Sequence, residues 1–489
     1  MFLGSSAISP VQKMDADAQY RALLARDRRF DGVFFVGVST TGIYCRPICP
    51  ARTPGRARCT FYRSASEAEG AGFRACLRCR PELAPGHASV DARSRLTTAA
   101  LARLDAGALN EGSVDDLAGA LGVSARHLRR TMEAEIGVVP LAYAASKRLA
   151  LAKRLIHDTA MPMTEVAFSS GFSSLRRFNA AFVAQFARPP SSMRRATGGR
   201  AGADAMITLR LDYRPPLDWE ALLRFIAARA ILGVERVDLG ASGRTIGTGA
   251  YYRTVHIGDA RGYLVARHLP ARSAVVVEVS PSLAGVLMPL VARLRALFDL
   301  DAEPSAVAAR LAKDPLLAPM VRARPGLRVP GAFDAFETAV RAVLGQQISV
   351  KGATTLAGAI ARDRGTSIDT PYEGLDRLFP AAKALLAPPI TGVPAARART
   401  IQILAGAPPI VRGDDPAETE ARLLAMPGVG PWTAGYLMMR TLGWPDAFPA
   451  ADLGIKKALG ETSPKRIEAR AEAWRPWRAY AAMHLWTGG

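Results

Sequence analysis

The pattern of hydrophobic and polar positions divides the chain into stretches of different character. The apolar run Gly32–Ser39 is typical of a short buried strand inside a small unit. Residues 91–195 carry the apolar spacing of helices. Ile207–Leu211 and Ser273–Val279 are expected to form strands, with one helix over Trp219–Ala230 between them. The remainder of the chain is again helical in pattern, interrupted by turns rich in proline and glycine.

These changes of pattern predict a multidomain, mainly α protein. The Gly- and Ala-rich stretch 196–204 is the clearest boundary, because such a composition suits a linker. The expected parts are a tail (1–13), a small α/β unit (14–88), an all-α domain (91–195), the linker (196–204), an α+β domain (205–285) and a second all-α region (286–489).

Composition adds a preference for a polyanionic partner. The 489 residues are enough for about three or four domains, and the formal net charge is +21. A basic chain of this kind suits binding to nucleic acid. A soluble protein encoded by a GC-rich genome, whose proteins are rich in arginine, would have the same balance of charges. No run approaches the ~18 apolar residues of a membrane span. The N-terminus also lacks the charged and apolar segments of a signal peptide, so we expect a cytoplasmic protein.

The five cysteines all fall between residues 45 and 79, which indicates a local metal site rather than a disulfide framework. Two close pairs, Cys45-x3-Cys49 and Cys76-x2-Cys79, can deliver four thiolates to one tetrahedral Zn²⁺. A unit this small lacks a large core, so the metal would contribute folding free energy. On spacing alone, a purely structural zinc is an open alternative.

The residues around these cysteines resemble the N-terminal domain of the Ada adaptive-response proteins. The likeness lies in 40–52 (TTGIYCRPICPAR) and 71–79 (AGFRACLRC). It implies that Cys45 is both zinc ligand and nucleophile, irreversibly removing a methyl group from a DNA methylphosphotriester. Cys59 has no place in the ligand set. The arginines near the site are expected to neutralise phosphates; they are Arg46, Arg52, Arg56, Arg58, Arg63, Arg74, Arg78 and Arg80. No cysteine follows Cys79, which excludes the alkylguanine methyltransferase domain of full-length Ada.

Residues 114–130 and 163–179 repeat one pattern, a helix, a turn at glycine and a second helix. Ser124 is the expected N-cap of the second helix in the first repeat. Two such units about 50 residues apart resemble the AraC-type DNA-binding domain, whose second helices lie in the major groove. The candidate contacts are Arg126, Arg129, Arg176, Arg177 and Asn179. The alternative for each is a merely solvated helix face.

The stretch 426–457 combines a tight turn with a carboxylate. Gly428 and Gly430 would let backbone N–H groups approach a DNA phosphate, and such turns often bind a monovalent cation. Asp452 follows within an apolar run. Alone, the turn is a common one. Because breaking an N-glycosidic bond creates positive charge on the sugar, a carboxylate nearby points to base excision.

From Met206 onwards the chain resembles the AlkA-type 3-methyladenine DNA glycosylases of the helix-hairpin-helix superfamily. The likeness lies in 213–219, 324–331, 333–337, 343–349, 426–457 and 474–481. It implies that Asp452 is catalytic and that an alkylated base, such as 3-methyladenine or 7-methylguanine, is flipped from the stack. An aromatic pocket suits such a cationic base. The implied pocket residues are Trp432, Tyr436, Trp486 and Phe225; ordinary core packing is the alternative for each.

The same resemblance assigns DNA contacts and reveals departures. Besides the two glycines, the implied contacts are Thr433, Gln346 and Gln347. Gln347 stands where the family has a leucine wedge, and Leu453 replaces a tyrosine found in some members. Relatives with lyase activity carry a lysine at the position of Trp432, so we expect a monofunctional enzyme that uses water. The absence of cysteine from this region excludes an iron–sulfur cluster.

Together these features predict an alkylation-damage repair protein fused to a methylphosphotriester-sensing transcriptional activator. The alternative is a transcription factor whose glycosylase half only binds DNA. The expected partners are double-stranded DNA and RNA polymerase, with no membrane. We expect a monomer of prokaryotic type, associated with the nucleoid.

Overall fold

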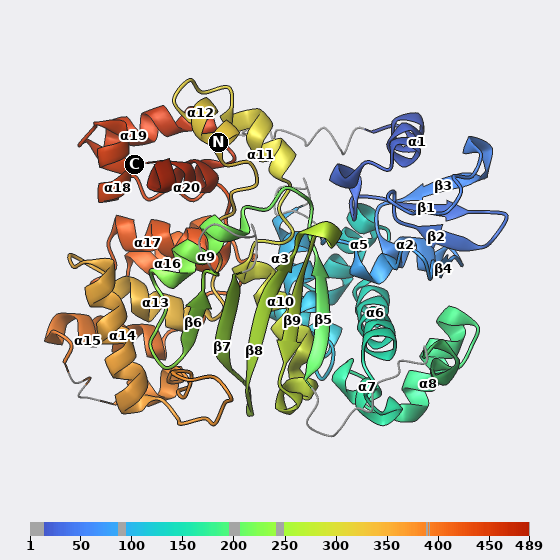
Figure 1. Cartoon of the computed structure of the whole chain (residues 1–489), viewed down its shortest axis with the longest axis horizontal. Coiled ribbons are helices and arrows are strands. Elements are labelled where there is room, and N and C mark those ends of the chain that lie inside the picture. Colours follow the sequence, from blue (N-terminus) through green and yellow to red (C-terminus); the bar gives the residue numbers. More distant parts are fainter. Residues whose placement is uncertain are drawn as a thin grey trace. The chain divides into compact units, whose positions relative to one another are not determined.

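The computed structural model describes residues 14–86, 94–194, 206–240, 249–387, 390 and 392–488 (Figure 1). The expected tail (1–13) and linker (196–204) lie outside these ranges. The chain forms two compact units. The first comprises Met1–Pro215, Ala284–Ala292 and Leu300–Glu303; the second comprises Pro216–Leu283, Arg293–Asp299 and Pro304–Gly489.

A four-stranded sheet organises the start of the first unit. The strand order is β3-β1-β2-β4, with β1 antiparallel to β2 and β3, and β2 parallel to β4. The predicted strand within Gly32–Ser39 is confirmed at β1 (Phe35–Val38), where Val36 and the preceding Phe34 join a buried cluster with Leu23. The elements are α1 (Ala16–Ala25), β1 (Phe35–Val38), β2 (Ile43–Cys45), β3 (Cys59–Tyr62), α2 (Ala65–Gly70), β4 (Arg74–Ala75) and the 3-10 turns Arg28–Phe30, Arg56–Arg58 and Pro81–Leu83.

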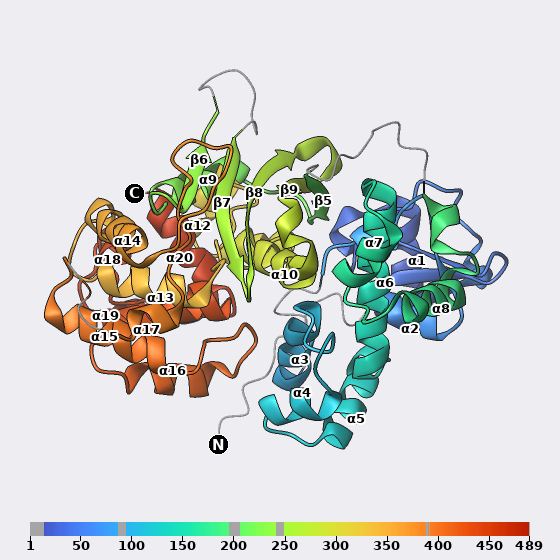
Figure 2. The same cartoon turned by 90° about the horizontal axis from the view of Figure 1, so that it is seen from below.

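A helical region follows, in which two helix-turn-helix units lie at opposite ends of one long helix (Figure 2). Ser124 accepts the N–H of His127 and so caps the second helix of the first unit, as predicted. Ser174 accepts the N–H of Arg177 in the same way. The elements are α3 (Arg95–Asp105), α4 (Val114–Ala120), α5 (Ala125–Ile136), α6 (Pro140–Asp158), α7 (Met163–Ser169), α8 (Leu175–Phe186), the 3-10 turn Pro190–Met193 and strand β5 (Ile207–Asp212).

Buried ion pairs fix the small sheet domain against α6. Lys153 is 1% exposed, and its ammonium lies 2.8 Å from Glu82. Arg80 donates to both carboxylate oxygens of Asp158, at 2.7 and 2.8 Å. Because a buried charge is stable only when it is paired and hydrogen-bonded, these contacts hold the two parts in one arrangement.

The second unit begins with an antiparallel sheet in which β9, β8, β7 and β6 are successive neighbours (Figure 1). Helix α9 (Trp219–Ala227) is shorter than the predicted helix by three residues. Its Trp219 is buried and donates from Nε1 to the carbonyl of Gly249 at 3.1 Å. The strands are β6 (Glu235–Asp238), β7 (Ala250–Ile257), β8 (Ala260–Leu269) and β9 (Ala274–Val279), and the 3-10 turns are Pro270–Arg272 and Pro281–Val286.

A balanced cluster of buried charges joins this sheet to helix α13 (Ala335–Leu344). Arg253 of β7 pairs with Glu235 of β6 and with Glu337 of α13. Arg341 of α13 pairs with the same two glutamates, at 3.0 Å in both cases. Two cations therefore face two anions, and loss of one partner would leave an uncompensated buried charge.

The rest of the second unit is helical, as the sequence predicts, and contains a helix-hairpin-helix. Helix α16 (Pro416–Leu424) leads through a turn into α17 (Pro431–Leu437), which continues as the π-helical turn Met438–Leu442. The remaining helices are α10 (Leu287–Leu297), α11 (Pro304–Leu311), α12 (Leu317–Ala323), α14 (Val350–Arg364), α15 (Ala395–Gly406), α18 (Leu453–Leu459), α19 (Pro464–Ala471) and α20 (Arg478–Gly488), with 3-10 turns at Ala382–Leu385 and Glu472–Trp474. Among the described helices, none has both the length and the apolar character that a bilayer span requires.

Candidate active site and metal centre

The carboxylate of Asp452 is held by four N–H groups. Asp452 is the N-cap of α18, and its Oδ1 accepts the backbone N–H of Gly454 at 2.8 Å and of Ile455 at 3.1 Å. Oδ1 also accepts the indole N–H of Trp486 at 2.8 Å, and Oδ2 accepts that of Trp432 at 2.8 Å. Among the described residues, Oδ2 accepts only this one hydrogen bond, and a carboxylate oxygen can accept at least two, so Oδ2 keeps capacity for a further partner. An arrangement of four donors suits an anion.

The structure brings the predicted aromatic residues together around this carboxylate. The rings of Trp432 and Tyr436 stack with their centroids 5.5 Å apart, and Tyr436 meets Trp486 at 6.4 Å. Phe225 stacks on Trp486 at 6.3 Å. Trp432, Tyr436 and Trp486 are partly exposed, whereas Phe225 is buried. Three aromatic side chains therefore remain accessible beside Asp452.

Two arginines that were not predicted from the sequence contact this aromatic group. Arg440 is 5% exposed, donates to the hydroxyl of Tyr436, and lies 4.8 Å from the Phe225 centroid and 5.4 Å from that of Tyr436. Arg229 lies 3.7 Å from the Phe225 centroid. Arg440 could have been found from the sequence, since it follows Tyr436 by four residues and so shares its helix face.

These arginines set the electrostatics of the pocket. Burial lowers the pKa of Arg440 to about 10. Burial acts to raise the pKa of Tyr436, but the charges of Arg440, Arg229 and Arg341 outweigh it and lower that pKa from its ordinary value. Because Phe225 already contacts both Arg229 and Arg440, its predicted direct contact with a base is not favoured. It supports Trp486 instead.

The contacts of the hairpin turn explain why Gly428 is a glycine and show what holds two of the residues expected to bind DNA. Gly428 has φ +83°, and a Cβ there would lie 2.1 Å from Oγ1 of Thr400. The side-chain amide of Gln346 donates to the Gly428 carbonyl at 2.8 Å and to the hydroxyl of Thr433 at 2.9 Å. Thr433 is only 2% exposed. The buried hydroxyl of Thr433 is therefore bonded to Gln346, which also fixes the turn through Gly428, and the DNA contacts expected of Thr433 and Gln346 stay predictions.

Other predicted contacts remain accessible. Gly430 is exposed and has no atom within 4 Å of its would-be Cβ. Gln347 is exposed, with φ +57°, in the loop between α13 and α14. Leu453 is 81% exposed beside the active carboxylate. The helix-turn-helix candidates are all exposed on α5 and α8; they are Arg126, Arg129, Arg176, Arg177 and Asn179.

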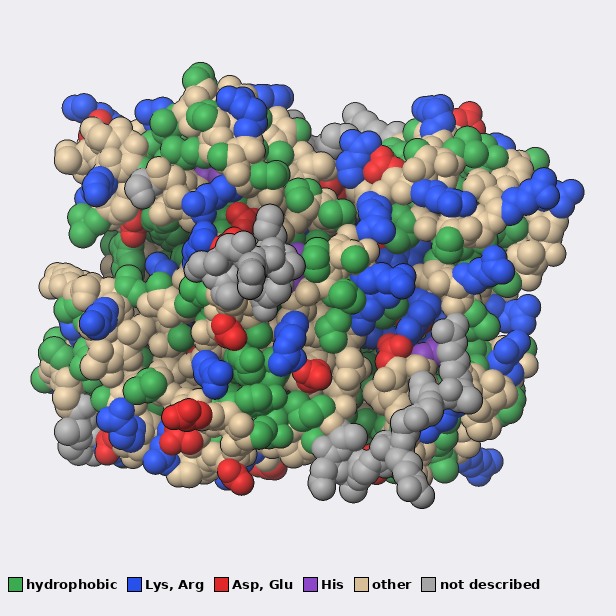
Figure 3. Space-filling model, in the orientation of Figure 1, with side chains coloured by type: hydrophobic (Ala, Val, Ile, Leu, Met, Phe, Trp, Pro, Cys, Tyr) green, Lys and Arg blue, Asp and Glu red, His purple; other side chains and the backbone are tan. Residues whose placement is uncertain are grey.

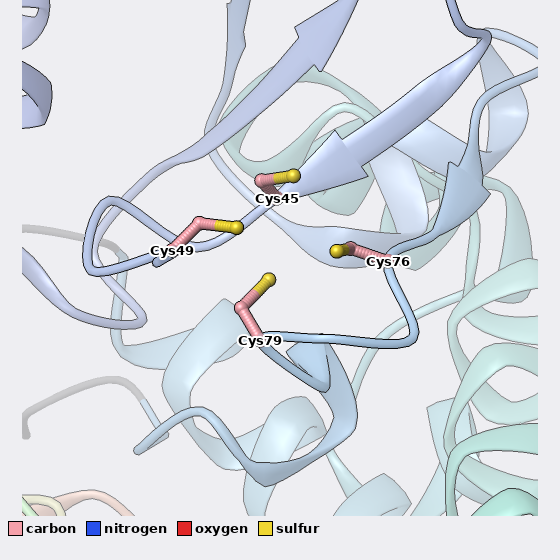
Figure 4. Close-up of side chains that lie close together, drawn as sticks. All are labelled: Cys45, Cys49, Cys76 and Cys79. Atoms are coloured by element: carbon pink, nitrogen blue, oxygen red, sulfur yellow. The ribbon is translucent and has the colours of Figure 1, made fainter. Parts of the chain in front are cut away.

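The four predicted zinc ligands converge on one point (Figure 4). Their sulfur atoms all lie within 4.8 Å of one another, with Cys45 partly exposed and Cys49, Cys76 and Cys79 buried. The neighbouring thiols of Cys49, Cys76 and Cys79 raise the pKa of Cys45. Four thiolates this close need a cation to remain ionised together, and the donor set fits one Zn²⁺. Cys59 lies apart in β3, with its sulfur 3.5 Å from the Gly55 carbonyl.

Cys45 borders a hollow of about 450 Å³. Its lining includes the apolar side chains of Val38, Ile43 and Leu77. Exposed arginines from the same lining are Arg52, Arg74, Arg78 and Arg188. The partly exposed sulfur thus faces a space with an apolar wall and a cationic edge, which suits an alkyl group attached to a phosphate.

Two of the arginines predicted to neutralise phosphates form ion pairs with carboxylates of the protein instead. Arg46 is 3% exposed and pairs with Asp31 and Asp212. Arg80 pairs with Glu82 and Asp158. The expectation is therefore wrong for Arg46 and Arg80, because carboxylates of the protein already pair with both guanidinium groups. On the face seen in Figure 3, basic side chains are spread widely, and several acidic side chains lie beside them.

Comparison with known proteins defines the class of the chain. Three family models match it: the metal binding domain of Ada over residues 18–82, a helix-turn-helix domain over 117–196, and the AlkA N-terminal domain over 208–334. The chain therefore joins an Ada-type metal-binding domain and a helix-turn-helix to an AlkA-type domain, which confirms the predicted resemblances and fold class.

A relative of nearly the same length identifies the family. The "Probable bifunctional transcriptional activator/DNA repair enzyme AlkA" of Mycobacterium tuberculosis is 39% identical, over 97% of this chain and 96% of that protein. The chain belongs to this family of Ada–AlkA fusion proteins. Escherichia coli "DNA-3-methyladenine glycosylase 2" is 35% identical over 56% of this chain and 95% of that protein. Escherichia coli Ada is 40% identical over 26% of this chain and 34% of that protein.

Solved structures include a "3-methyladenine dna-glycosylase" from Archaeoglobus fulgidus. It covers 57% of this chain and 97% of its own, with a TM-score of 0.48 at 20% identity.

The cysteine geometry predicts different effects of two Cys→Ser substitutions on zinc content. Cys79→Ser should lower bound zinc below one ion per chain, because it removes a buried ligand. Cys59→Ser should keep one ion. Metal analysis of the purified proteins measures both, and equal zinc loss in the two variants would contradict the assignment of the ligands.

The hairpin geometry predicts that Gly428→Ala destabilises the second unit by at least about 2 kcal/mol, through backbone strain and collision with Thr400. Gly460→Ala is the matched control, since Gly460 has φ +61° but open space around its would-be Cβ. Strain alone should cost about 1 kcal/mol there. Thermal or urea unfolding compares the variants, and equal losses would show that the Thr400 contact does not matter.

Proposed function

We propose that the second unit is a DNA glycosylase that hydrolyses the N-glycosidic bond of alkylated bases of the 3-methyladenine and 7-methylguanine type. The observation that carries this proposal is the carboxylate of Asp452, fixed by four N–H donors beside accessible aromatic rings. The similarity to the Escherichia coli glycosylase supports the choice of substrate.

The chemistry follows from the charge that develops on the sugar. The bond from C1′ to the base nitrogen breaks, and its electron pair leaves with the base. Positive charge then builds on the deoxyribose, where the anionic Asp452 stabilises it. A water oxygen bonds to C1′ and loses its proton to solvent, which leaves a free base and an abasic site. The open side of Oδ2 is the part of the carboxylate available to face the sugar.

The aromatic side chains have two functions in this proposal. Trp432 and Trp486 hold Asp452 through their indole N–H groups while their rings bound the base pocket. Tyr436 provides a third face, stacked on Trp432. An alkylated purine carries positive charge and lies well against electron-rich rings. The flipped base would therefore occupy the space bounded by these three side chains.

We propose that the enzyme has no lyase activity. Attack on C1′ by an amine needs a lysine at the position of Trp432, and here the indole N–H of that residue faces Asp452 instead. On the DNA side, we propose that the exposed Gly430 approaches a phosphate through its backbone, with a monovalent cation at the turn. Gln347, at the tip of its loop, would fill the space that the flipped base leaves.

We propose a second activity at Cys45, transfer of a methyl group from a DNA methylphosphotriester. The thiolate sulfur attacks the methyl carbon, the carbon–oxygen bond breaks, and the phosphodiester leaves with the electron pair as an anion. Zn²⁺ bound by the four cysteines keeps their sulfurs ionised. Cys45 suits the nucleophile because it is the partly exposed member of the set and borders the hollow. Cys79, in contrast, is buried and accepts the N–H of Arg46 at 3.4 Å.

Methylation would connect this centre to transcription. It removes one negative charge beside the arginine edge of the hollow, which reduces repulsion of DNA phosphates. We propose that α5 and α8 then bind promoter DNA in the major groove through their exposed polar residues, and that the protein contacts RNA polymerase. The proposal includes a monomeric, nucleoid-associated protein with the domain boundaries expected from the sequence.

Asp452→Asn should lower the release of 3-methyladenine from methylated duplex DNA by at least about 100-fold, because it removes the anion while asparagine still caps α18. Binding to DNA with an abasic analogue should persist. Asp369→Asn, an exposed position in the same unit with the same charge change, is the control. Chromatography of released bases gives the rates. Undiminished release by Asp452→Asn would contradict the catalytic function of Asp452, and no release by the wild type would favour the transcription-factor alternative.

Incubation with DNA carrying methylphosphotriesters should add one methyl group to Cys45, and peptide mass spectrometry locates it. The Cys59→Ser protein should be methylated as fast as the wild type. Methylation of Cys59, or of no cysteine in zinc-loaded protein, would refute the acceptor assignment and leave the metal with a structural function.

A further inference from the structure

Arg46 connects three of the four metal ligands through its backbone. It follows Cys45 directly, and its carbonyl accepts the N–H of Cys49 at 3.1 Å. Its own N–H donates to Sγ of Cys79 at 3.4 Å. Any rotation of the Arg46 peptide would therefore move the nucleophile and disturb two further ligands together.

The guanidinium of Arg46 is fixed by buried partners. It donates to both carboxylate oxygens of Asp31, to Oδ2 of Asp212 at 3.1 Å and to the carbonyl of Cys79 at 3.2 Å. The exposed fractions of the Arg46 and Asp212 side chains are both 3%. Charge-assisted hydrogen bonds between buried groups are strong and directional, so these carboxylates determine where the arginine lies.

Asp212 comes from a different part of the sequence than the cysteines. It is the last residue of β5, in the region that matches the AlkA N-terminal domain. Arg210 of the same strand also pairs with Asp212. Two residues later, Arg214 is 1% exposed and donates to the carbonyls of Asp31 and Gly86, at 3.0 and 2.7 Å. Residues 212–214 are thus attached to the metal-binding domain through the buried side chains of Asp212 and Arg214.

We propose that Asp212 is a positioning residue of the methyl-acceptor centre, so that the first strand of the AlkA-type region completes the Ada-type site. Asp212 holds the Arg46 guanidinium, and Arg46 in turn holds the turn from Cys45 to Cys49 against Cys79. The proposal rests on the acceptor function proposed above for Cys45. It implies that the metal-binding domain of this chain depends on a residue that its own family match, 18–82, does not contain.

The alternative is that Asp212 only stabilises the fold. The two cases differ at the metal. A positioning function predicts that loss of the Asp212 charge changes the ligand field and the retention of the ion even where the protein remains folded. A stabilising function alone predicts a lower unfolding temperature with an unchanged metal centre.

The test uses the full-length protein with Asp212→Asn, which keeps the size of the side chain but removes its charge. Zinc transfer to a chromophoric chelator should be faster than in the wild type by about tenfold, the effect expected from one charge-assisted hydrogen bond. The thiolate-to-metal absorption of the Co²⁺-loaded protein should shift, and methylation of Cys45 should slow by a similar factor. Release of 3-methyladenine should remain within about twofold of wild type, since the second unit is unaltered.

Three further variants test whether faster zinc release comes from loss of the Asp212 charge. Asp212→Glu keeps the charge and should restore slow zinc release. Asp259→Asn makes the same charge change at an exposed turn between β7 and β8 and should leave the metal centre unchanged. If the Asp212→Asn protein does not fold, the Arg46→Lys variant is tested in its place. Lysine keeps the charge but lacks the planar guanidinium group, so zinc release should again be faster than in the wild type.

The outcomes separate this inference from the acceptor function. Zinc release and Co²⁺ absorption in Asp212→Asn that match the wild type would overturn the positioning function of Asp212. A wild-type chain that never gains a methyl group would overturn the acceptor function of Cys45, while the zinc and Co²⁺ comparisons would still decide whether Asp212 positions the metal ligands.

Discussion

The carboxylate of Asp452 depends on groups that arrive from three parts of the second unit. Trp432 comes from the helix after the hairpin, Trp486 from the last helix, and Gly454 and Ile455 from the helix that Asp452 itself caps. Four N–H donors hold an anion in place without adding a positive charge that would cancel it. An anion held in this way is preorganised to stabilise a cation, because no reorganisation is needed when the charge develops.

The need to hold these N–H donors against the Asp452 carboxylate explains much of the surrounding structure. The hairpin must place Trp432 at the start of α17, and the turn is fixed by Gln346 and by the close packing of Gly428 on Thr400. Tyr436, which stacks on Trp432, accepts a hydrogen bond from Arg440. The same guanidinium also donates to the backbone carbonyls of Pro330 and Gly331. The residues that do not touch the carboxylate thus determine the positions of those that do.

The sequence predicted which residues lie together in the two centres better than it predicted the contacts that support them. The spacing of the cysteines, the glycine turn and the N-cap Ser124 are local features, and local patterns report them directly. The partners of Arg46 are not local, since Asp212 is 166 positions away. The arginines that surround the cysteines in the sequence therefore predicted a phosphate contact for Arg46, where the fold buries an ion pair. The hydrogen bond of Thr433 could not be predicted from the sequence for the same reason, because its partner Gln346 is 87 positions away.

In the proposed glycosylase, Asp452 acts as an anion against a cationic sugar. Binding of two DNA duplexes tests this directly, one with a protonated pyrrolidine and one with a neutral tetrahydrofuran in place of the deoxyribose. The wild-type protein should bind the cationic analogue more tightly, and Asp452→Asn should lose that preference while still binding the neutral duplex. An equal preference for the cation in both proteins would contradict the account.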